Sequence, residues 1–228
     1  MMAHHARELI VDSFVREVEE SSLSKIRISA FIQKLELNRN TFYYHFSSKY
    51  DVALTVFQED LGGLLADEFP RNKLVMLPYA GTAESREPVL LPFYTHVEIG
   101  ARNLDSSGFF KAVARCIRNR PAFYRRLFTR AEPEFLDLVK KTYRPAFAGD
   151  IDFILGGRYL PETTKDFLAC CCADLLISET VYVAGHLADA DALLEEKTNP
   201  FWNIMQESLH AAIQAHPVNR TYLRSQEG

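Results

Sequence analysis

Apolar residues recur at intervals of three and four along most of this 228-residue chain, and this spacing restricts what it can fold into. In residues 6–20, for example, Ile10, Phe14 and Val18 fall on one face of a helix, and most charged residues fall on the other. Alternating patterns typical of strands are scarce. The chain is therefore predicted to be all-α.

The same spacing predicts a series of helices that changes character at a proline-rich stretch. Short helices are expected over 27–35 and 39–45, and a fourth begins after Ser48, whose spacing to Asp51 is that of a capping box. Four prolines between residues 70 and 92 exclude a continuous helix there, so we predict a connection. Longer helices are expected over 90–104, 107–119, 121–142 (interrupted at Pro133), 161–187 and 200–215.

Composition excludes several classes of protein. The net charge is −4, with no run of about 18 apolar residues and no signal-peptide pattern, so we expect a cytoplasmic protein without a membrane partner. Cys116 and the consecutive Cys170, Cys171 and Cys172 match no metal or redox spacing. We interpret the trio as buried packing residues, with a redox sensor or a metal site as the alternatives.

Charge and helix length together single out residues 25–49. Helices of about two turns persist only when packed on another helix, and two of them joined by a tight turn form a helix-turn-helix arrangement. This stretch carries five basic residues and one acid, a net charge of +4, whereas residues 1–24 carry −3. Aromatic residues alternate with the basic ones, which suits contacts with phosphate and sugar.

Residues 38–49, Asn-Arg-Asn-Thr-Phe-Tyr-Tyr-His-Phe-Ser-Ser-Lys, resemble the recognition helix of TetR-family transcriptional regulators. The resemblance covers roughly residues 7–62. It implies an N-terminal three-helix helix-turn-helix DNA-binding domain over 1–66 and a larger C-terminal helical bundle over 67–228 for ligand binding and dimerisation. It also implies that double-stranded DNA is contacted by Arg27, Ser29, Arg39, Asn40, Thr41, Tyr43, Tyr44 and Lys49. Phe42 and Phe46 are expected in the core.

Two residues depart from the family pattern. Glu36 stands where a glycine is usual in the inter-helix turn, and glutamate tolerates a positive φ poorly. Ile32 replaces a usual small residue, which implies looser or shifted packing against the next helix.

The C-terminal half offers candidate interfaces but no specific motif. The strongly apolar helices over 166–187 and 200–215 are predicted to form a homodimer interface, with burial in the core as the alternative. A pocket for a small-molecule effector of unknown identity is predicted from Tyr94, His96, Arg102, Phe110, Arg115, Tyr124, Phe128, Tyr143, Tyr182 and His186. Residues 111–130 carry seven basic residues and no acid, which fits a solvated surface, an acidic effector or a partner surface.

These features predict a dimeric, ligand-responsive repressor that binds DNA and needs no cofactor or metal. One alternative is a regulator without an effector that acts through a protein partner, as an activator or co-activator. A remote alternative is a helical thiol-dependent enzyme, for which no nucleophile–base spacing is present. We therefore do not expect an enzyme.

Overall fold

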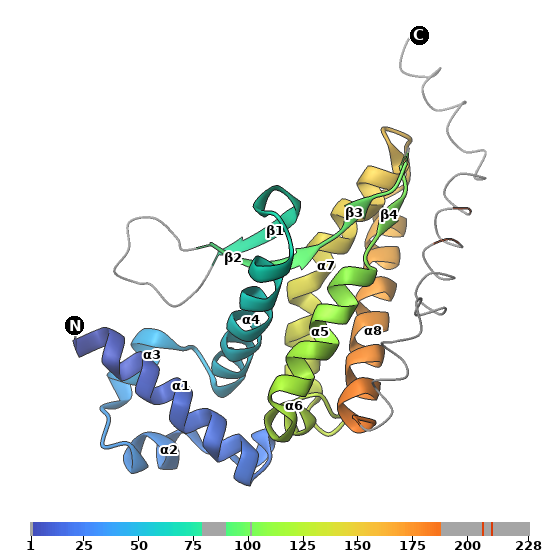
Figure 1. The fold of residues 1–228 in the computed structure, drawn as a ribbon. Helices are drawn as coiled ribbons and strands as arrows, with labels where there is room; N and C mark the ends of the chain where they lie inside the picture. The colour runs from blue at the N-terminus through green and yellow to red at the C-terminus, as the bar shows by residue number, and fades with distance from the viewer. Residues whose placement is uncertain (1, 79–89, 101, 188–206, 208–210, 212–228) are drawn as a thin grey trace.

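The computed structural model describes residues 2–78, 90–100, 102–187, 207 and 211, and within them the chain is mostly helical, as predicted (Figure 1). Two short antiparallel two-stranded sheets accompany the helices. The helices are α1 (Met2–Glu20), α2 (Ile28–Lys34), α3 (Arg39–His45), α4 (Lys49–Glu68), α5 (Ser107–Asn119), α6 (Pro121–Leu127), α7 (Pro133–Leu155) and α8 (Glu162–Gly185), with 3₁₀ turns η1 (Leu23–Lys25) and η2 (Arg71–Lys73).

Helices α1, α2 and α3 form an N-terminal head, in agreement with the helices predicted over 6–20, 27–35 and 39–45. Phe14 of α1 meets Phe31 of α2 edge to face, with ring centroids 5.9 Å apart. The N-cap predicted at Ser48 of α4 is also confirmed, although Asp51 accepts from Ser47 and not from the N–H of Ser48, as a full capping box requires. The Ser48 hydroxyl accepts the Asp51 N–H at 3.2 Å, and the Asp51 carboxylate accepts the Ser47 N–H at 2.8 Å.

Helix α4 leads from the head into the rest of the molecule (Figure 1). It continues through Gly62 and Gly63 to Glu68, although glycines weaken a helix. At Gly62 the backbone of another segment comes too close for a side chain, because a Cβ there would lie 2.9 Å from the carbonyl oxygen of Pro92. Gly62 therefore lets the chain after the proline-rich stretch pack directly on α4.

The prediction of a helix over 90–104 is wrong. These residues form β2 (Leu90–Thr95), β3 (Val97–Glu98) and β4 (Leu104–Asp105), and β2 pairs with β1 (Leu74–Pro78) inside the stretch predicted as a connection. The apolar run of β2 fits a helix or a strand, and its pairing with β1 across the proline-rich stretch makes it a strand. Pro92 is accommodated at a register shift between Val75 and Met76 of β1.

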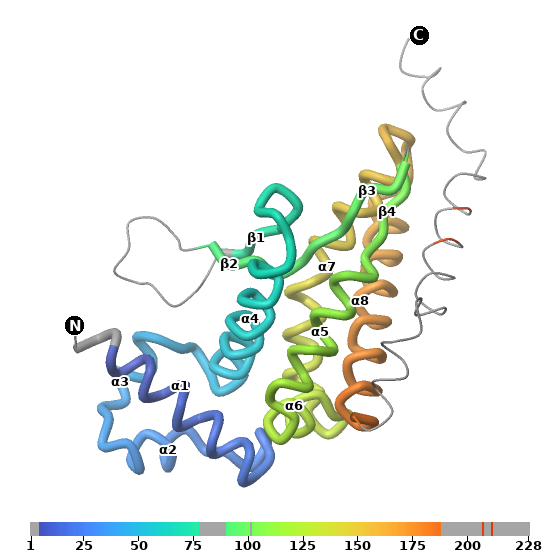
Figure 2. The backbone as a smooth tube through the Cα atoms, viewed as in Figure 1, coloured from blue at the N-terminus to red at the C-terminus, as the bar shows by residue number. Residues whose placement is uncertain are grey.

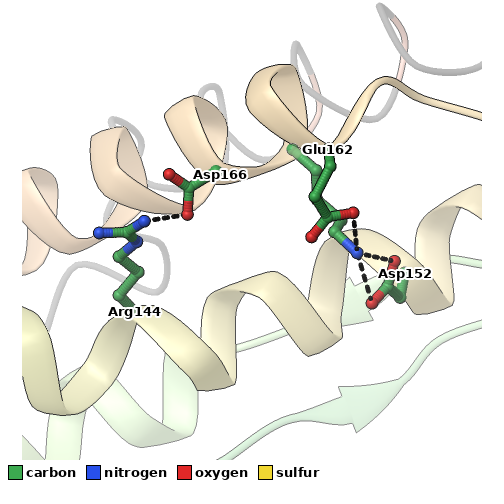
Figure 3. A network of polar contacts seen from close by, with 5 residues as sticks. Arg144, Asp152, Glu162 and Asp166 are labelled. Carbon is green, nitrogen blue, oxygen red and sulfur yellow. Dashed lines mark hydrogen bonds and ion pairs between the residues drawn. The ribbon is translucent and has the colours of Figure 1, made fainter.

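Helices α5 to α8 form the C-terminal bundle (Figure 2). The helix predicted over 121–142 is two helices, since α6 ends at Leu127 and Pro133 starts α7, which runs on to Leu155. Helix α8 lies antiparallel along α7, and ion pairs cross between them (Figure 3). Arg144 pairs with Asp166, and the ammonium of Lys165 lies 3.2 Å from Asp152 and 3.0 Å from Glu162.

Helix α8 is long and strongly apolar. By length and composition it could cross a membrane, with a mean hydropathy of 1.7 over a window of which 33% is buried. A single such helix is weak evidence, because core helices of soluble proteins meet the same criteria. Phe167 and Tyr182 are among its exposed residues. The predicted helix over 200–215 lies outside the described residues, apart from Glu207 and Ala211.

Candidate nucleic-acid interface

Helix α3 presents a polar and aromatic face to solvent because its apolar side is buried in the core. Phe42 is fully buried, and its ring lies 6.0 Å from that of Phe46, which follows the helix. Asn38 caps the helix, since its side-chain oxygen accepts the Asn40 N–H at 2.8 Å. The residues that remain on the outer side are Arg39, Asn40, Tyr43 and Tyr44, all exposed, with Thr41 half-buried.

The exposed face of α3 is partly ordered before any ligand binds. The Arg39 guanidinium lies over the ring of Tyr43, 5.4 Å from its centroid. Tyr43 has 46% of its surface exposed. An arginine and an asparagine at the start of an exposed helix can each form two hydrogen bonds with the edge of a base.

The start of α2 adds two of the predicted contact residues. Arg27 occupies the N-cap position and Ser29 lies in the first turn, and both are exposed. Beside them an open hollow of about 210 Å³ lies between the end of α1 and α2, lined by Glu17, Ser21, Lys25, Ile26, Arg27, Ala30, Phe31 and Lys34. Lys34 is engaged there, since its ammonium lies 2.6 Å from Glu17, which raises the pKa of Lys34.

Lys49, the last predicted DNA contact, has a structural role in the head. Its ammonium donates to the carbonyl oxygens of Ser24 at 3.0 Å and of Ile26 at 3.1 Å. These bonds hold η1 against the start of α4. A lysine ammonium has three hydrogens, so one remains for a phosphate oxygen.

The turn between α2 and α3 contains a non-glycine residue in a strained backbone conformation. Glu36 has a φ of 55°, in the left-handed region that favours glycine, as its departure from the family pattern suggested. Ile32 is buried, and its carbonyl oxygen accepts the Leu37 N–H at 3.0 Å across the turn. The turn is thus closed by a backbone hydrogen bond, with Glu36 in the left-handed region.

A buried carboxylate joins the head to the bundle. Glu132, just before α7, is 1% exposed, and its Oε1 accepts the backbone N–H of Ser24 in η1 at 2.9 Å. Its Oε2 is buried without a hydrogen-bond partner among the described residues. Sequence reasoning missed this contact, because a single glutamate before a proline carries no signal of a partner 108 residues away.

Further contacts along α4 strengthen the same junction. Phe57 of α4 packs against Tyr124, Phe128 and Tyr143 of the bundle, with centroid distances of 5.9, 5.1 and 6.4 Å. Beside it, the Tyr124 hydroxyl donates to Asp60 at 2.6 Å. The head and the bundle consequently share one hydrophobic core through α4.

The residues predicted to form an effector pocket lie in several places. Tyr94, Phe110, Tyr124, Phe128 and Tyr143 are buried in the core. Arg115 is exposed and forms an ion pair with Glu68 at 2.6 Å, and Tyr182 and His186 stack at 4.2 Å on the exposed end of α8. Arg102 packs on Gly156, where a Cβ would collide with its guanidinium.

Of these predicted pocket residues, His96 and Tyr94 both contact the carboxylate of Asp150. The Tyr94 hydroxyl donates to Asp150 at 2.5 Å, and the Nδ1 of His96 lies 2.8 Å from the other carboxylate oxygen of Asp150. Burial and the adjacent Asp150 raise the pKa of Tyr94 well above its usual value.

The cysteines are free thiols in the described chain. Cys116 is buried, and Cys170, Cys171 and Cys172 are partly buried on α8. Burial raises the pKa of Cys116 and of Cys172 to about 12. Within the described residues, no group of three or more His, Cys, Asp or Glu side chains could hold a metal ion.

No protein-family model and no curated protein matches the chain. Among solved structures it is similar to the dihydroxyacetone kinase operon activator DhaS, with 12% sequence identity and a TM-score of 0.43 over 90% of this chain and 96% of that one. Because both values are low, the function is inferred below from the residues of this chain.

Proposed function

We propose that the protein is a sequence-specific DNA-binding transcriptional regulator of the TetR type. The observation that carries this proposal is the exposed face of α3, where Arg39, Asn40 and Tyr43 project from a helix fixed by buried Phe42. A short helix braced in this way can enter the major groove, and its first residues then meet base edges. Arg27, Ser29, Thr41, Tyr44 and Lys49 would bind phosphates around it.

We further propose a homodimer, because a single head reads too short a sequence for a specific operator. Helix α8 supports this, since it exposes apolar side chains along the face that does not pack on α7, with Phe167 65% exposed. A symmetric dimer would place two copies of α3 about one DNA turn apart, on a palindromic site.

Repression relieved by a small-molecule effector is the regulatory mode we propose. The contacts of α4 with both head and bundle support it, because a ligand that favours one arrangement of the bundle would change the separation of the heads. An activator that acts through a protein partner is the alternative. A thiol enzyme that uses Cys116 or Cys172 is not supported, since thiols with a pKa of about 12 stay protonated at neutral pH. We propose that the protein acts in the cytoplasm.

The test is selection of DNA from a random or genomic library by the purified full-length chain. We expect enrichment of a palindromic sequence, and binding that weakens as salt increases. Tyr43→Ala should reduce affinity for the selected site by about 10- to 100-fold, since contacts of this kind contribute about 1–3 kcal/mol. Tyr159→Ala is the matched control, because Tyr159 is equally exposed and far from α3 in the sequence. Failure to enrich any sequence would refute the proposal.

A further inference from the structure

Two basic residues of 111–130 form ion pairs with acids of α4, whereas the three at the end of α6 and in the turn after it do not. Arg115 forms its ion pair with Glu68, and the Arg120 guanidinium lies 3.3 Å from Asp60. By contrast, Arg125, Arg126 and Arg130 are all exposed, and none has an ion pair or hydrogen bond with a described residue through its side chain. We call these three residues the α6 patch.

The α6 patch exists because of how α6 packs. Phe123, Tyr124 and Leu127 bury one face of this helix, which turns Arg125 and Arg126 outward. Arg130 follows in the turn before Glu132. Three exposed guanidinium groups without counter-ions among the described residues suit an anionic partner.

The fold places the α6 patch beside the DNA-binding head. The bond between Glu132 and the Ser24 N–H brings the segment that carries Arg130 against η1, and α6 itself contacts α1 (Figure 1). Lys49 holds the other side of η1 through the Ser24 carbonyl. The start of α4, η1 and the α6 patch therefore meet at one end of the molecule.

Cations of the head continue the patch. Lys25 in η1 and Arg27 at the start of α2 are both exposed. Of the nearby acids, Glu132 is buried and accepts the Ser24 N–H, and Glu17 is paired with Lys34. Glu19 and Glu20 at the end of α1 form no ion pair with the patch.

We propose that the α6 patch binds phosphates of the DNA backbone outside the groove read by α3, an inference that rests on the proposed function. Arginine matches a phosphate with two parallel hydrogen bonds, so three of them form a strong non-specific clamp. The patch would thereby lengthen the DNA segment that each subunit covers. It also compensates for a net charge of −4, which otherwise disfavours DNA.

The experiment compares variants on a DNA site selected by the wild-type chain. The triple variant Arg125→Ala, Arg126→Ala, Arg130→Ala removes the patch. A charge-matched control, Arg71→Ala, Lys73→Ala, Lys111→Ala, removes three positive charges from η2 and the early part of α5. Circular dichroism and thermal melting check that both variants fold. Affinity is measured from about 50 to 300 mM salt, a range over which backbone contacts are strongly screened.

We expect the patch variant to lower the slope of log K against log salt by about 0.9 for each phosphate that it no longer neutralises, with base preference unchanged. The control should leave the slope close to that of the wild type. Neutral methylphosphonate linkages placed outside the α3 half-site should weaken wild-type binding but not binding by the patch variant.

Equal slopes for patch variant, control and wild type would overturn the inference while leaving the proposed function intact. So would a patch variant that binds DNA normally but fails to regulate in cells, which would assign the patch to a protein partner. If the wild-type chain selects no DNA sequence, the proposed function fails and this inference fails with it.

Discussion

Glu36 is the residue at which the head stores backbone strain. Its φ of 55° places a glutamate in the left-handed region, which costs a residue with a Cβ about 1 kcal/mol or more. Glu36→Gly should therefore raise the free energy of unfolding by about 0.5–1 kcal/mol, because part of the gain is offset by the greater freedom of glycine in the unfolded chain. Urea denaturation measures this change.

Glu36→Ala separates backbone strain from charge. Alanine removes the carboxylate but keeps the Cβ, so we expect little or no stabilisation from it. Since Glu36 is exposed and lies outside the face of α3, both variants should bind the selected DNA normally. Equal stabilisation by alanine and glycine would show that charge, and not φ, is responsible.

Short-range signals at single residues were sufficient to predict the head. The spacing around Phe14, Phe31 and Phe42, the cap at Ser48 and the departure at Glu36 all depend on neighbours within a few positions. The outward position of Arg39, Asn40 and Tyr43 follows from the same helical period. Whether these residues bind DNA stays a prediction.

At the scale of elements, the sequence was less informative wherever a partner lies far along the chain. Strand β2 was predicted as a helix because its apolar run fits either structure, and its pairing with β1 crosses the whole connection. The scattered pocket residues show the same limit, since a helix face cannot be assigned before its neighbours are known. Glu132 is the clearest case, as its partner Ser24 is 108 residues away.

The contact of Glu132 with η1 leads to a prediction at this scale. Glu132→Ala removes the carboxylate that accepts the Ser24 N–H. We therefore expect the free energy of unfolding to fall by about 1–3 kcal/mol. The Ser24 amide should also exchange its hydrogen faster, because the junction between head and bundle opens more often. Hydrogen exchange of residues 22–26 and urea denaturation test the two effects.

Glu134→Ala is the control for this change. Glu134 lies in the first turn of the same helix but is exposed, so its loss affects only the helix dipole, by at most about 1 kcal/mol. It should leave exchange at Ser24 unchanged. Identical exchange in the Glu132 and Glu134 variants would contradict a role for Glu132 in joining the head to the bundle.

At the scale of the whole molecule, the buried thiols and phenols make the fold sensitive to alkaline pH. Burial raises the pKa of Cys116 and Cys172 from 9.0 to about 12, and it raises the pKa of Tyr94, Tyr124 and Tyr143 well above 10. At a pH between the pKa of a group in the unfolded chain and its higher pKa in the folded chain, the folded chain keeps a proton that the unfolded chain releases. Stability is therefore fully present below about pH 9 and decreases as the pH rises toward 12.

We expect the free energy of unfolding to fall by about 3 kcal/mol or more between pH 9 and 10.5, since each of the two thiols contributes up to about 1.4 kcal/mol per pH unit in this window and the phenols add to it. Urea denaturation at a series of pH values measures the slope. Cys172→Ala should make the slope shallower, because one of the two thiols no longer titrates. Cys170→Ala is the control, as it leaves Cys116 and Cys172 in place. A free energy of unfolding that stays constant from pH 8 to 10.5 would contradict the raised pKa of Cys116 and Cys172 in the folded chain.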